Sequence, residues 1–495
     1  GKTEAYLGLI GTVSFYRRLN PVTRERESLN PSISAIMRYT LRLLTADQAG
    51  RLIRLCGAMN HVWSKNKAND AVFSNFSVGM WIGKSASPNA FYTHPEYQTS
   101  TSVSVQEVFD RHVRDEELPE SSFIQFTTCP WCGDDSVGDV DNWKIIDIAS
   151  SHGRLPKIQG RCTGDACPFN NGLPFSCVDE DLYLHPPTIL LGTVDKMVQL
   201  AHNNHAKSIK HGEYDVNESL NSRRMFGFDT GGPLPPDLII QDELHLLSGP
   251  LGTLAGMIET ALTTAWAHQG HKPKYVAATA TIRGASRDIG LIYGRSLNVF
   301  PPPLLSAKDN FFAQELPVSE SSPGRMHLGL LAPPRRSRSA TNQPAASLLQ
   351  SINNLRAIGV ADKILDPYWT MVMYYNSLRE LGGGQSSLRE NIPRWMSQYA
   401  TSSKSELRNL AEGGDVELTS RKSATELALS RQRLNIELGT DPRYVVDVLS
   451  TSSMFQVGVD IPRLGLMTIV GQPRSNSEYI QSSGRVGRKS TKPGL

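Results

Sequence analysis

Short apolar runs alternate along the chain with longer segments of mixed polarity. The run at 238–240 predicts a buried strand, because a strand covered on both faces is apolar throughout, and the run at 275–278 predicts another strand. Residues 368–381 predict a strand that leads into a helix, and residues 444–473 predict two buried strands around a loop at 452–462. Strands separated by helical segments indicate an α/β fold.

Other segments predict a linker, the start of a second domain and elements within that domain. Residues 301–323 are rich in Pro and Ser, which predicts a linker. The sequence RMHLGLLAPP (325–334) then predicts the opening strand of a second domain, and the polar stretch at 333–344 predicts a loop. Residues 416–432 predict a short strand followed by an amphipathic helix.

Length and composition are those of a soluble protein with several domains. The chain has 495 residues, of which 39% are apolar and 20% charged. We expect a first domain over 1–300 and a second over 324–495. No apolar run approaches the ~20 residues that span a bilayer, so no membrane association is expected. The first residue is not Met, and both ends are expected to be cut from a longer protein.

Net charge limits how nucleic acid could be bound. The formal net charge is only +3, so any such contact has to come from local groups of Lys and Arg.

Four of the six cysteines form two close pairs. Cys129 and Cys132 are separated by two residues, and Cys162 and Cys167 by four. Few cysteines in a long chain, placed in pairs, predict metal binding in a reducing compartment, here the cytoplasm. Tetrahedral zinc takes four thiolates from knuckles of this kind, so we expect a structural zinc site.

Alternatives to this ligand set stay open. Cys177 or His152 could replace one ligand, and the cysteines could instead be reduced, buried thiols. A closed four-cysteine site leaves no open coordination position, so we expect it to support folding. We place the zinc module at 129–167, within an insertion at about 60–180 that contacts nucleic acid or a partner.

The chain begins with GKTEAYLGL, which resembles the end of a phosphate-binding loop followed by a helix. In such loops backbone N–H groups bind phosphates, as Gly1 would here. Lys2 would reach the outer phosphates and Thr3 would hold Mg²⁺. Three residues alone are weak evidence for this role.

The strand at 238–240 is followed by Asp242 and Glu243. At the end of a strand in an α/β sheet, one carboxylate can hold Mg²⁺ and a second can activate water. An acidic turn at the start of a helix is the alternative. The next strand ends in Thr279-Ala280-Thr281, whose hydroxyls could link a phosphate site to a neighbouring domain.

Two arginines lie close together near the end of the chain, in SEYIQSSGRVGRKS (477–490). A glycine precedes both Arg485 and Arg488, and Gln481 lies four residues upstream. Guanidinium groups bind phosphate oxygens in a planar fork, although a basic surface turn is the commoner interpretation. Earlier in the same half, Gly458 permits a close backbone approach and Asp460 is a hydrogen-bonding group.

In this order and at these separations, the segments resemble those of superfamily 2 helicases and translocases of the DExH type. The resemblance runs along nearly the whole chain through Lys2-Thr3, Asp242-Glu243-Leu244-His245, Thr279-Ala280-Thr281, Gly458-Val459-Asp460 and Gln481 to Arg488.

What the resemblance implies is a fold of two tandem RecA-like P-loop NTPase domains, with ATP and Mg²⁺ bound in the cleft between them. Gln481, Arg485 and Arg488 would then reach the γ-phosphate. Gly458 and Asp460 would help to bind ATP, and His245, Thr279 and Thr281 would couple hydrolysis to domain closure.

A narrower resemblance is visible at 37–52, 190–201 and 457–489. These segments are similar to the helicase subunit of the bacterial DISARM phage-defence system and to related bacterial repair helicases. The resemblance implies DNA more than RNA as substrate, and a cysteine-rich partner subunit. The implied nucleic-acid contacts are Thr40, Arg42, Thr193, Asp195 and Ser452, for each of which a helix cap or a turn is the alternative.

The leading hypothesis is an ATP-dependent DNA helicase or translocase in anti-phage defence. The first alternative is a nucleic-acid-stimulated ATPase that remodels its substrate without separating strands. The second is a zinc-bearing nucleic-acid-binding scaffold without turnover.

Overall fold

The structure is a computed structural model that forms two units, Gly1–Leu297 and Asn298–Leu495. The residues that it describes are 2–39, 42–66, 73–84, 86–92, 103–119, 121–150, 153–201, 205–210, 213–247, 249–279, 285–302, 309–314, 317–320, 323–331, 337–411, 413–419, 421–422, 424–440, 445–456, 461–473, 475–488 and 492–495. Across these residues, no helix combines the length and apolar character that crossing a bilayer requires.

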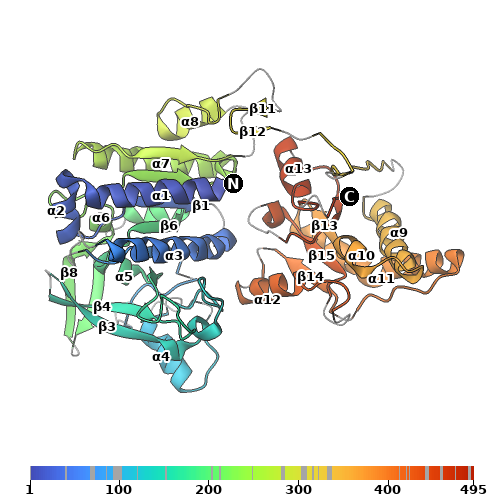
Figure 1. The fold of residues 1–495 in the computed structure, drawn as a ribbon, viewed down its shortest axis with the longest axis horizontal. Helices are drawn as coiled ribbons and strands as arrows, with labels where there is room; N and C mark the ends of the chain where they lie inside the picture. Colours follow the sequence, from blue (N-terminus) through green and yellow to red (C-terminus); the bar gives the residue numbers. More distant parts are fainter. Residues whose placement is uncertain are drawn as a thin grey trace. The chain divides into compact units, whose positions relative to one another are not determined.

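The first unit is built on a parallel sheet in the order β10-β9-β1-β6-β2-β5 (Figure 1). Its strands are β1 Ala35–Tyr39, β2 Val78–Trp81, β5 Phe175–Ser176, β6 Ile189–Thr193, β9 Leu238–Gln241 and β10 Lys274–Ala277. Every residue of β1, β2, β6 and β9 is buried, as expected for a parallel sheet covered on both faces. Because all strands are parallel, their carboxyl ends meet at one edge.

Helices cover both faces of this sheet. α1 (Lys2–Leu19) and α3 (Arg42–Lys65) contact each other and both contact β1, so they share a face (Figure 1). α7 (Gly249–Ala267) packs Leu262 and Trp266 against Ile36 of β1 and Ile239 of β9. The other helices are α2 Pro21–Leu29, α4 Val105–Val113, α5 Asp179–Leu184, α6 Ser222–Met225 and α8 Ala285–Tyr293, with the shorter 3₁₀ turns η2 Asp135–Gly138, η3 Val140–Asn142, η4 Asp195–Ala201 and η5 Leu244–Leu246.

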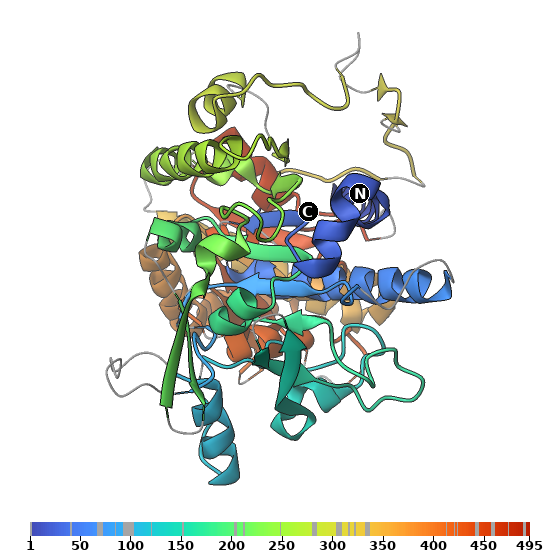
Figure 2. The same ribbon diagram turned by 90° about the vertical axis from the view of Figure 1, so that its left-hand side faces the viewer.

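Two antiparallel hairpins extend from the first unit, on the opposite side from α7 (Figure 2). They are formed by β3 (Trp143–Ser150) with β4 (Gly153–Gly160), and by β7 (His205–Lys210) with β8 (Glu213–Asn221). The range expected for the insertion, about 60–180, also contains β2 and β5, which belong to the main sheet. The cysteine pairs and the β3–β4 hairpin lie between these two strands.

The segment expected to be a linker holds a two-stranded ribbon, β11 (Asp309–Asn310) with β12 (Ala313–Gln314). The strand expected within 325–334 is a wrong prediction, because residues 323–331 have no regular structure. The apolar side chains that suggested a strand are exposed, including Leu328 and Leu331. They have no neighbouring strand in the unit's sheet, so an apolar run alone did not make a strand here.

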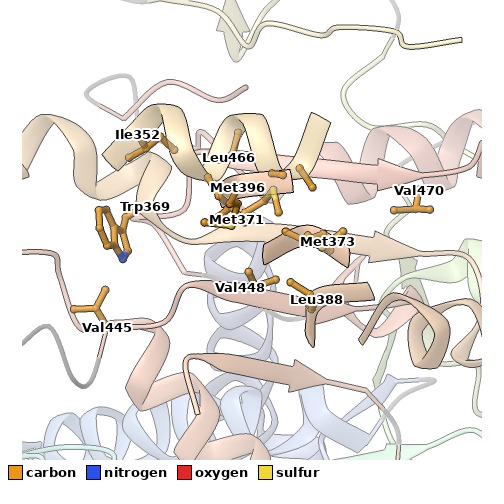
Figure 3. Close-up of a cluster of buried hydrophobic side chains, with 14 of the residues drawn as sticks. Ile352, Trp369, Met371, Met373, Leu388, Met396, Val445, Val448, Leu466 and Val470 are labelled. Atoms are coloured by element: carbon orange, nitrogen blue, oxygen red, sulfur yellow. The ribbon is translucent and has the colours of Figure 1, made fainter. Parts of the chain in front are cut away.

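The second unit has a smaller parallel sheet in the order β14-β15-β13-β16. Its strands are β13 Met371–Tyr375, β14 Asp415–Leu418, β15 Val448–Thr451 and β16 Leu466–Val470, and its helices are α9 Ser337–Ala357, α10 Asp362–Trp369, α11 Leu378–Ser403, α12 Ala424–Leu434, η6 Ser453–Gln456 and α13 Asn476–Ser483. Figure 3 shows Met371 of β13, Met396 of α11 and Leu466 of β16 gathered in its core.

Sequence predictions for this unit had mixed outcomes. The strand-to-helix transition within 368–381 is confirmed, with Ser377 capping α11 by accepting a hydrogen bond from the N–H of Glu380. The strands around 452–462 and the strand–helix pair at 416–432 are also confirmed. The loop expected at 333–344 is wrong from Ser337 onward, where α9 begins. The polar residues of this stretch suggested a loop, but Ala345, Leu349 and Ile352 bury one face of the helix, which also contains Pro344.

Candidate nucleotide, nucleic-acid and metal sites

The helix that follows the phosphate-loop sequence begins at Lys2 and lies against the centre of the sheet. α1 contacts β1 and β9, the strand that carries the acidic pair. Thr3 is half-buried in the first turn of α1. Gly1 and the side chain of Lys2 lie outside the described part of the structure. Mg²⁺ in nucleotide sites takes a Ser or Thr hydroxyl and a carboxylate, so Thr3 and Asp242 have the right chemistry to hold it.

Tyr6, one turn further along α1, is buried beside the acidic pair. Burial is the largest cause that raises the pKa of Tyr6 well above its usual range, and the carboxylates of Asp242 and Glu243 raise it further. These two charges act on Tyr6 only because the start of α1 lies next to the end of β9. Thr3 and Asp242, the residues predicted to hold Mg²⁺, therefore come from neighbouring elements of the first unit.

The turn after β9 has a defined and strained geometry. The N–H of Asp242 donates to the carbonyl of Arg38 at 3.2 Å, and the N–H of Glu243 donates to Asp242 Oδ1 at 3.0 Å. Glu243 has a left-handed backbone with φ of +48°, which costs a non-glycine residue about 1 kcal/mol or more. Strain of this kind is concentrated at functional sites.

The same turn is joined to the end of the neighbouring strand. His245 Nδ1 lies 3.3 Å from Glu243 Oε2, with both side chains mostly buried. The N–H of Leu244 donates to the carbonyl of Ala278 at 2.9 Å, and Thr279 follows directly. The turn at 242–245 and the end of β10 are thus connected by hydrogen bonds. Thr281 lies outside the described residues.

A buried polar network near this turn was not predicted from the sequence. Arg38 is the one charged residue of β1, and its guanidinium forms a close ion pair with Glu259 of α7. Tyr275 of β10 donates to Glu259 Oε2 at 2.8 Å. The pair links β1, β10 and α7, and the backbone of Arg38 supports Asp242. A single Arg in an apolar strand was the only signal in the sequence.

The residues predicted to contact nucleic acid are only partly described. Thr193 ends β6, pairs in register with Tyr39 of β1 and is buried. Asp195 begins η4 and Arg42 begins α3, but their side chains, like all of Thr40, lie outside the described part. Ser452 follows β15 of the second unit and is buried. The role of these residues stays a prediction.

A buried ion pair lies directly behind the turn at 193–195. Lys196 Nζ donates to Asp179 Oδ2 at 2.6 Å, and both side chains are buried. Asp179 begins α5, in the segment that connects strands β5 and β6 of the sheet. This pair joins the predicted nucleic-acid turn to that segment, and the sequence analysis did not find it.

In the second unit, α13 leads into residues 484–488, here called the arginine loop. Arg485 Nη2 donates a short hydrogen bond to the carbonyl of Gln456. The side chain of Gln456 in turn donates to Tyr374 Oη and to Glu478 Oε1, and Tyr374 Oη donates to Glu478 at 2.9 Å. Arg485 is thereby anchored to η6, immediately before Gly458 and Asp460, which lie outside the described residues.

Arg488 has a different environment from Arg485. Its side chain is exposed, whereas those of Arg485 and Gln481 are half-buried. Gly487 between them has a φ of +60°, a conformation that favours glycine. The loop thus presents one anchored and one outward-facing guanidinium.

The four predicted cysteine ligands lie together. Their Sγ atoms are all within 4.8 Å of one another, with Cys132–Cys162 at 3.5 Å and Cys129–Cys167 at 3.8 Å. Tetrahedral zinc with bonds of about 2.3 Å places its sulfurs about 3.8 Å apart, so the cluster fits zinc. All six cysteines are free thiols.

The alternative ligands have different positions. Cys177 is buried and directs its Sγ toward the carbonyl of Phe123 at 3.6 Å, and it is not part of the metal-binding group found among the described residues. His152 lies outside those residues.

Comparisons with known proteins agree with these features. Residues 430–490 match the family model for the helicase conserved C-terminal domain. The chain is 35% identical over 518 residues to the DISARM protein DrmA of Bacillus paralicheniformis, a match that covers 100% of this chain and 44% of the relative. The chain therefore spans less than half the length of that relative.

Solved structures with lower similarity include three helicases. The DNA-bound DUF1998 helicase MrfA is 12% identical with a TM-score of 0.40, covering 94% of this chain and 43% of the other. The Mycobacterium smegmatis helicase Lhr bound to ssDNA and AMP-PNP is 13% identical with a TM-score of 0.44, covering 96% and 41%. Mss116p bound to ssRNA and AMP-PNP is 11% identical with a TM-score of 0.48, covering 100% and 63%.

The similarity to the DISARM protein, which extends over all of this chain, shows that the chain belongs to the family of that protein, and residues 430–490 match the helicase conserved C-terminal domain within it.

Proposed function

We propose that the chain is an ATP-dependent DNA helicase or translocase that couples ATP hydrolysis to movement on nucleic acid. The observation that carries the proposal is the burial of Tyr6 beside Asp242 and Glu243, because it brings the helix after Lys2-Thr3 to the acidic turn. An ATPase of this superfamily needs these two elements to meet at one sheet edge.

In this proposal the first unit holds Mg·ATP. Gly1, Lys2 and Thr3 bind the phosphates, and Thr3 with Asp242 holds Mg²⁺, which neutralises charge on the β- and γ-phosphates when bound. Glu243 accepts a proton from the attacking water, and the contact with His245 Nδ1 orients its carboxylate. This catalytic role would account for the strained, left-handed backbone of Glu243.

The second unit supplies the positive charge for the transferring phosphoryl group. Arg485 and Arg488 stabilise that group, and Gln481 contributes a polar contact. Arginine charge at this position contributes roughly 10³ to 10⁵ in rate in related hydrolases. Gly458 and Asp460 contact the nucleotide, and Thr279 and Thr281 couple hydrolysis to domain movement.

For the wider role we propose DNA as substrate, through Thr40, Arg42, Thr193, Asp195 and Ser452. The similarity to the DISARM protein supports a part in anti-phage defence and a cysteine-rich partner subunit. Zinc at Cys129, Cys132, Cys162 and Cys167 would be structural, because four thiolates leave no open coordination position.

The decisive experiment is Glu243→Gln. Nucleotide binding should persist, because the amide keeps the size of the side chain, while DNA-stimulated hydrolysis should fall by about 10² or more, the usual contribution of a general base. Glu117→Gln, a change of the same chemistry at an exposed position, is the control. Unchanged turnover in Glu243→Gln would remove Glu243 from this role.

A strand-displacement assay run beside the ATPase assay separates the alternatives. Hydrolysis with displacement indicates a helicase, and hydrolysis without it indicates a translocase or remodeller. DNA binding without any hydrolysis would favour the zinc-bearing scaffold.

A further inference from the structure

Arg325 lies beside the arginine loop, outside every motif considered so far. Its Nε donates a hydrogen bond to the carbonyl oxygen of Val486 at 2.9 Å, and its side chain is half-buried. The next residue, Met326, donates its N–H to the carbonyl of Gly494 at 3.0 Å. The side chain of Arg325 is therefore bonded to the arginine loop, while the adjacent backbone is bonded to Gly494 near the end of the sequence.

The hydrogen bond from Arg325 falls on a peptide group that is already held from its other side. The N–H of Gly487, which belongs to the same peptide unit as the Val486 carbonyl, donates to the carbonyl of Leu464 at 2.8 Å. The side chain of Val486 is buried. Because a peptide unit is planar and rigid, fixing both its oxygen and its nitrogen fixes the direction of the chain that enters Arg488.

Arg325 also adds positive charge at this place. Burial lowers the pKa of Arg325, and the charge of Arg488 lowers it further, so the two guanidinium groups lie close enough to repel each other. Like charges held close together are unfavourable until an anion binds between them. A phosphate oxyanion is the ligand that would relieve this repulsion.

We propose that Arg325 is a positioning residue for Arg488: it holds the Val486–Gly487 peptide and raises the positive potential where the transferring phosphoryl group arrives. This inference rests on the proposed ATPase function. It concerns a residue that touches the arginine loop, which is proposed to act on the transferring phosphoryl group. Its loss should therefore affect the transition state more than the binding of ATP.

The test compares Arg325→Ala, Arg325→Gln and Arg325→Lys with Arg389→Gln, which changes an exposed arginine of α11. Steady-state ATP hydrolysis is measured with DNA present, together with the affinity for ADP–aluminium fluoride and for ADP alone. The first ligand mimics the transferring phosphoryl group, and it reports on the loop without turnover. The Gln and Lys variants keep a donor and the aliphatic stem if Arg325→Ala folds poorly.

We expect kcat to fall about tenfold to a hundredfold in Arg325→Ala and Arg325→Gln, with KM for ATP and ADP affinity within about twofold of wild type. The preference for ADP–aluminium fluoride should fall in parallel, and Arg325→Lys should recover part of it through its charge. Wild-type kcat in Arg325→Gln, or an equal loss of ADP affinity, would overturn the inference while leaving the proposed function intact. A wild-type protein that neither hydrolyses ATP nor binds ADP–aluminium fluoride would overturn both.

Discussion

Tyr6 of α1 is buried beside Asp242 at the end of β9, so that burial raises the pKa of the phenol and the carboxylate raises it further. The phenol stays neutral at physiological pH and can donate a hydrogen bond, whereas a second carboxylate in this place would repel Asp242. Packing of this ring fixes the start of α1, with Thr3 in its first turn, relative to the acidic turn.

The position of Tyr6 leads to a first prediction. Tyr6→Ala should lower the free energy of unfolding by about 3 kcal/mol, as for other buried rings, and should weaken Mg·ATP binding because α1 loses its contact with β9. Tyr6→Phe should keep most of both properties, since the ring remains. Chemical denaturation and ATP titration are the measurements. Tyr16→Ala is the control, because it removes an exposed tyrosine of the same helix. An ATP affinity in Tyr16→Ala as low as that in Tyr6→Ala would contradict the prediction.

The sequence predicts an element of this fold when the residues that determine the element are close together in the chain. Buried strands such as β9 and β13 were predictable because most of their residues are apolar or aromatic, and the acidic pair directly follows β9. Local chemistry was sufficient there. The cysteine cluster was equally predictable, since the spacing of Cys129 and Cys132 already limits their geometry.

Features that depend on distant residues were not predictable. Arg325 donates a hydrogen bond to Val486, 161 residues later in the chain. The hydrogen bond from Lys196 to Asp179 likewise depends on how the chain folds. The apolar residues around Leu328 suggested a strand, but a strand requires a neighbour, and neighbours are set by tertiary structure. The opposite error occurred at 337–344, where a loop was predicted and the structure has a helix. Burial of one face of α9 outweighed the backbone N–H that Pro344 lacks.

A second prediction concerns pH. Asp181 of α5 is buried, and burial raises its pKa to about 6 although the charge of Lys157 lowers it. In the unfolded chain the carboxyl loses its proton near its ordinary value of 3.8. The unfolded state therefore binds fewer protons between about pH 4 and 6, so Asp181 lowers stability progressively across this window and fully above it.

Asp181→Asn should accordingly stabilise the protein by about 2 kcal/mol at pH 7.5, and the gain should disappear as pH falls to about 4. Unfolding by urea at several pH values measures this. Asp147→Asn, at an exposed position of β3, should change stability little at any pH. A gain in Asp181→Asn that does not depend on pH would show that ionisation is not its cause.

A third prediction concerns the metal. Elemental analysis of the purified protein should find about one zinc per chain, and Cys132→Ser should abolish it and lower the melting temperature, because the metal supports folding. Cys177→Ala should keep the zinc, since this thiol faces the carbonyl of Phe123. Loss of zinc in Cys177→Ala would place Cys177 among the ligands, and wild-type protein without zinc would leave the cysteines as buried thiols.

The two arginines of the arginine loop should respond differently to substitution, because Arg485 is half-buried and donates to the carbonyl of Gln456, whereas Arg488 is exposed. Arg485→Ala removes the partner of a half-buried carbonyl and should cost about 1–2 kcal/mol of stability in addition to turnover. Arg488→Ala changes an exposed side chain and should alter stability by less than about 0.5 kcal/mol. Both should lower kcat by roughly 10³, as expected for arginine charge on a transferring phosphoryl group. Thermal unfolding and DNA-stimulated ATP hydrolysis separate the two effects.

Arg488→Lys keeps the charge without the planar fork, so recovery of full activity in that variant would show that charge alone is required. Turnover within tenfold of wild type in Arg488→Ala would instead mean that the exposed guanidinium does not reach the phosphate, and that Arg485 acts there despite its anchored position.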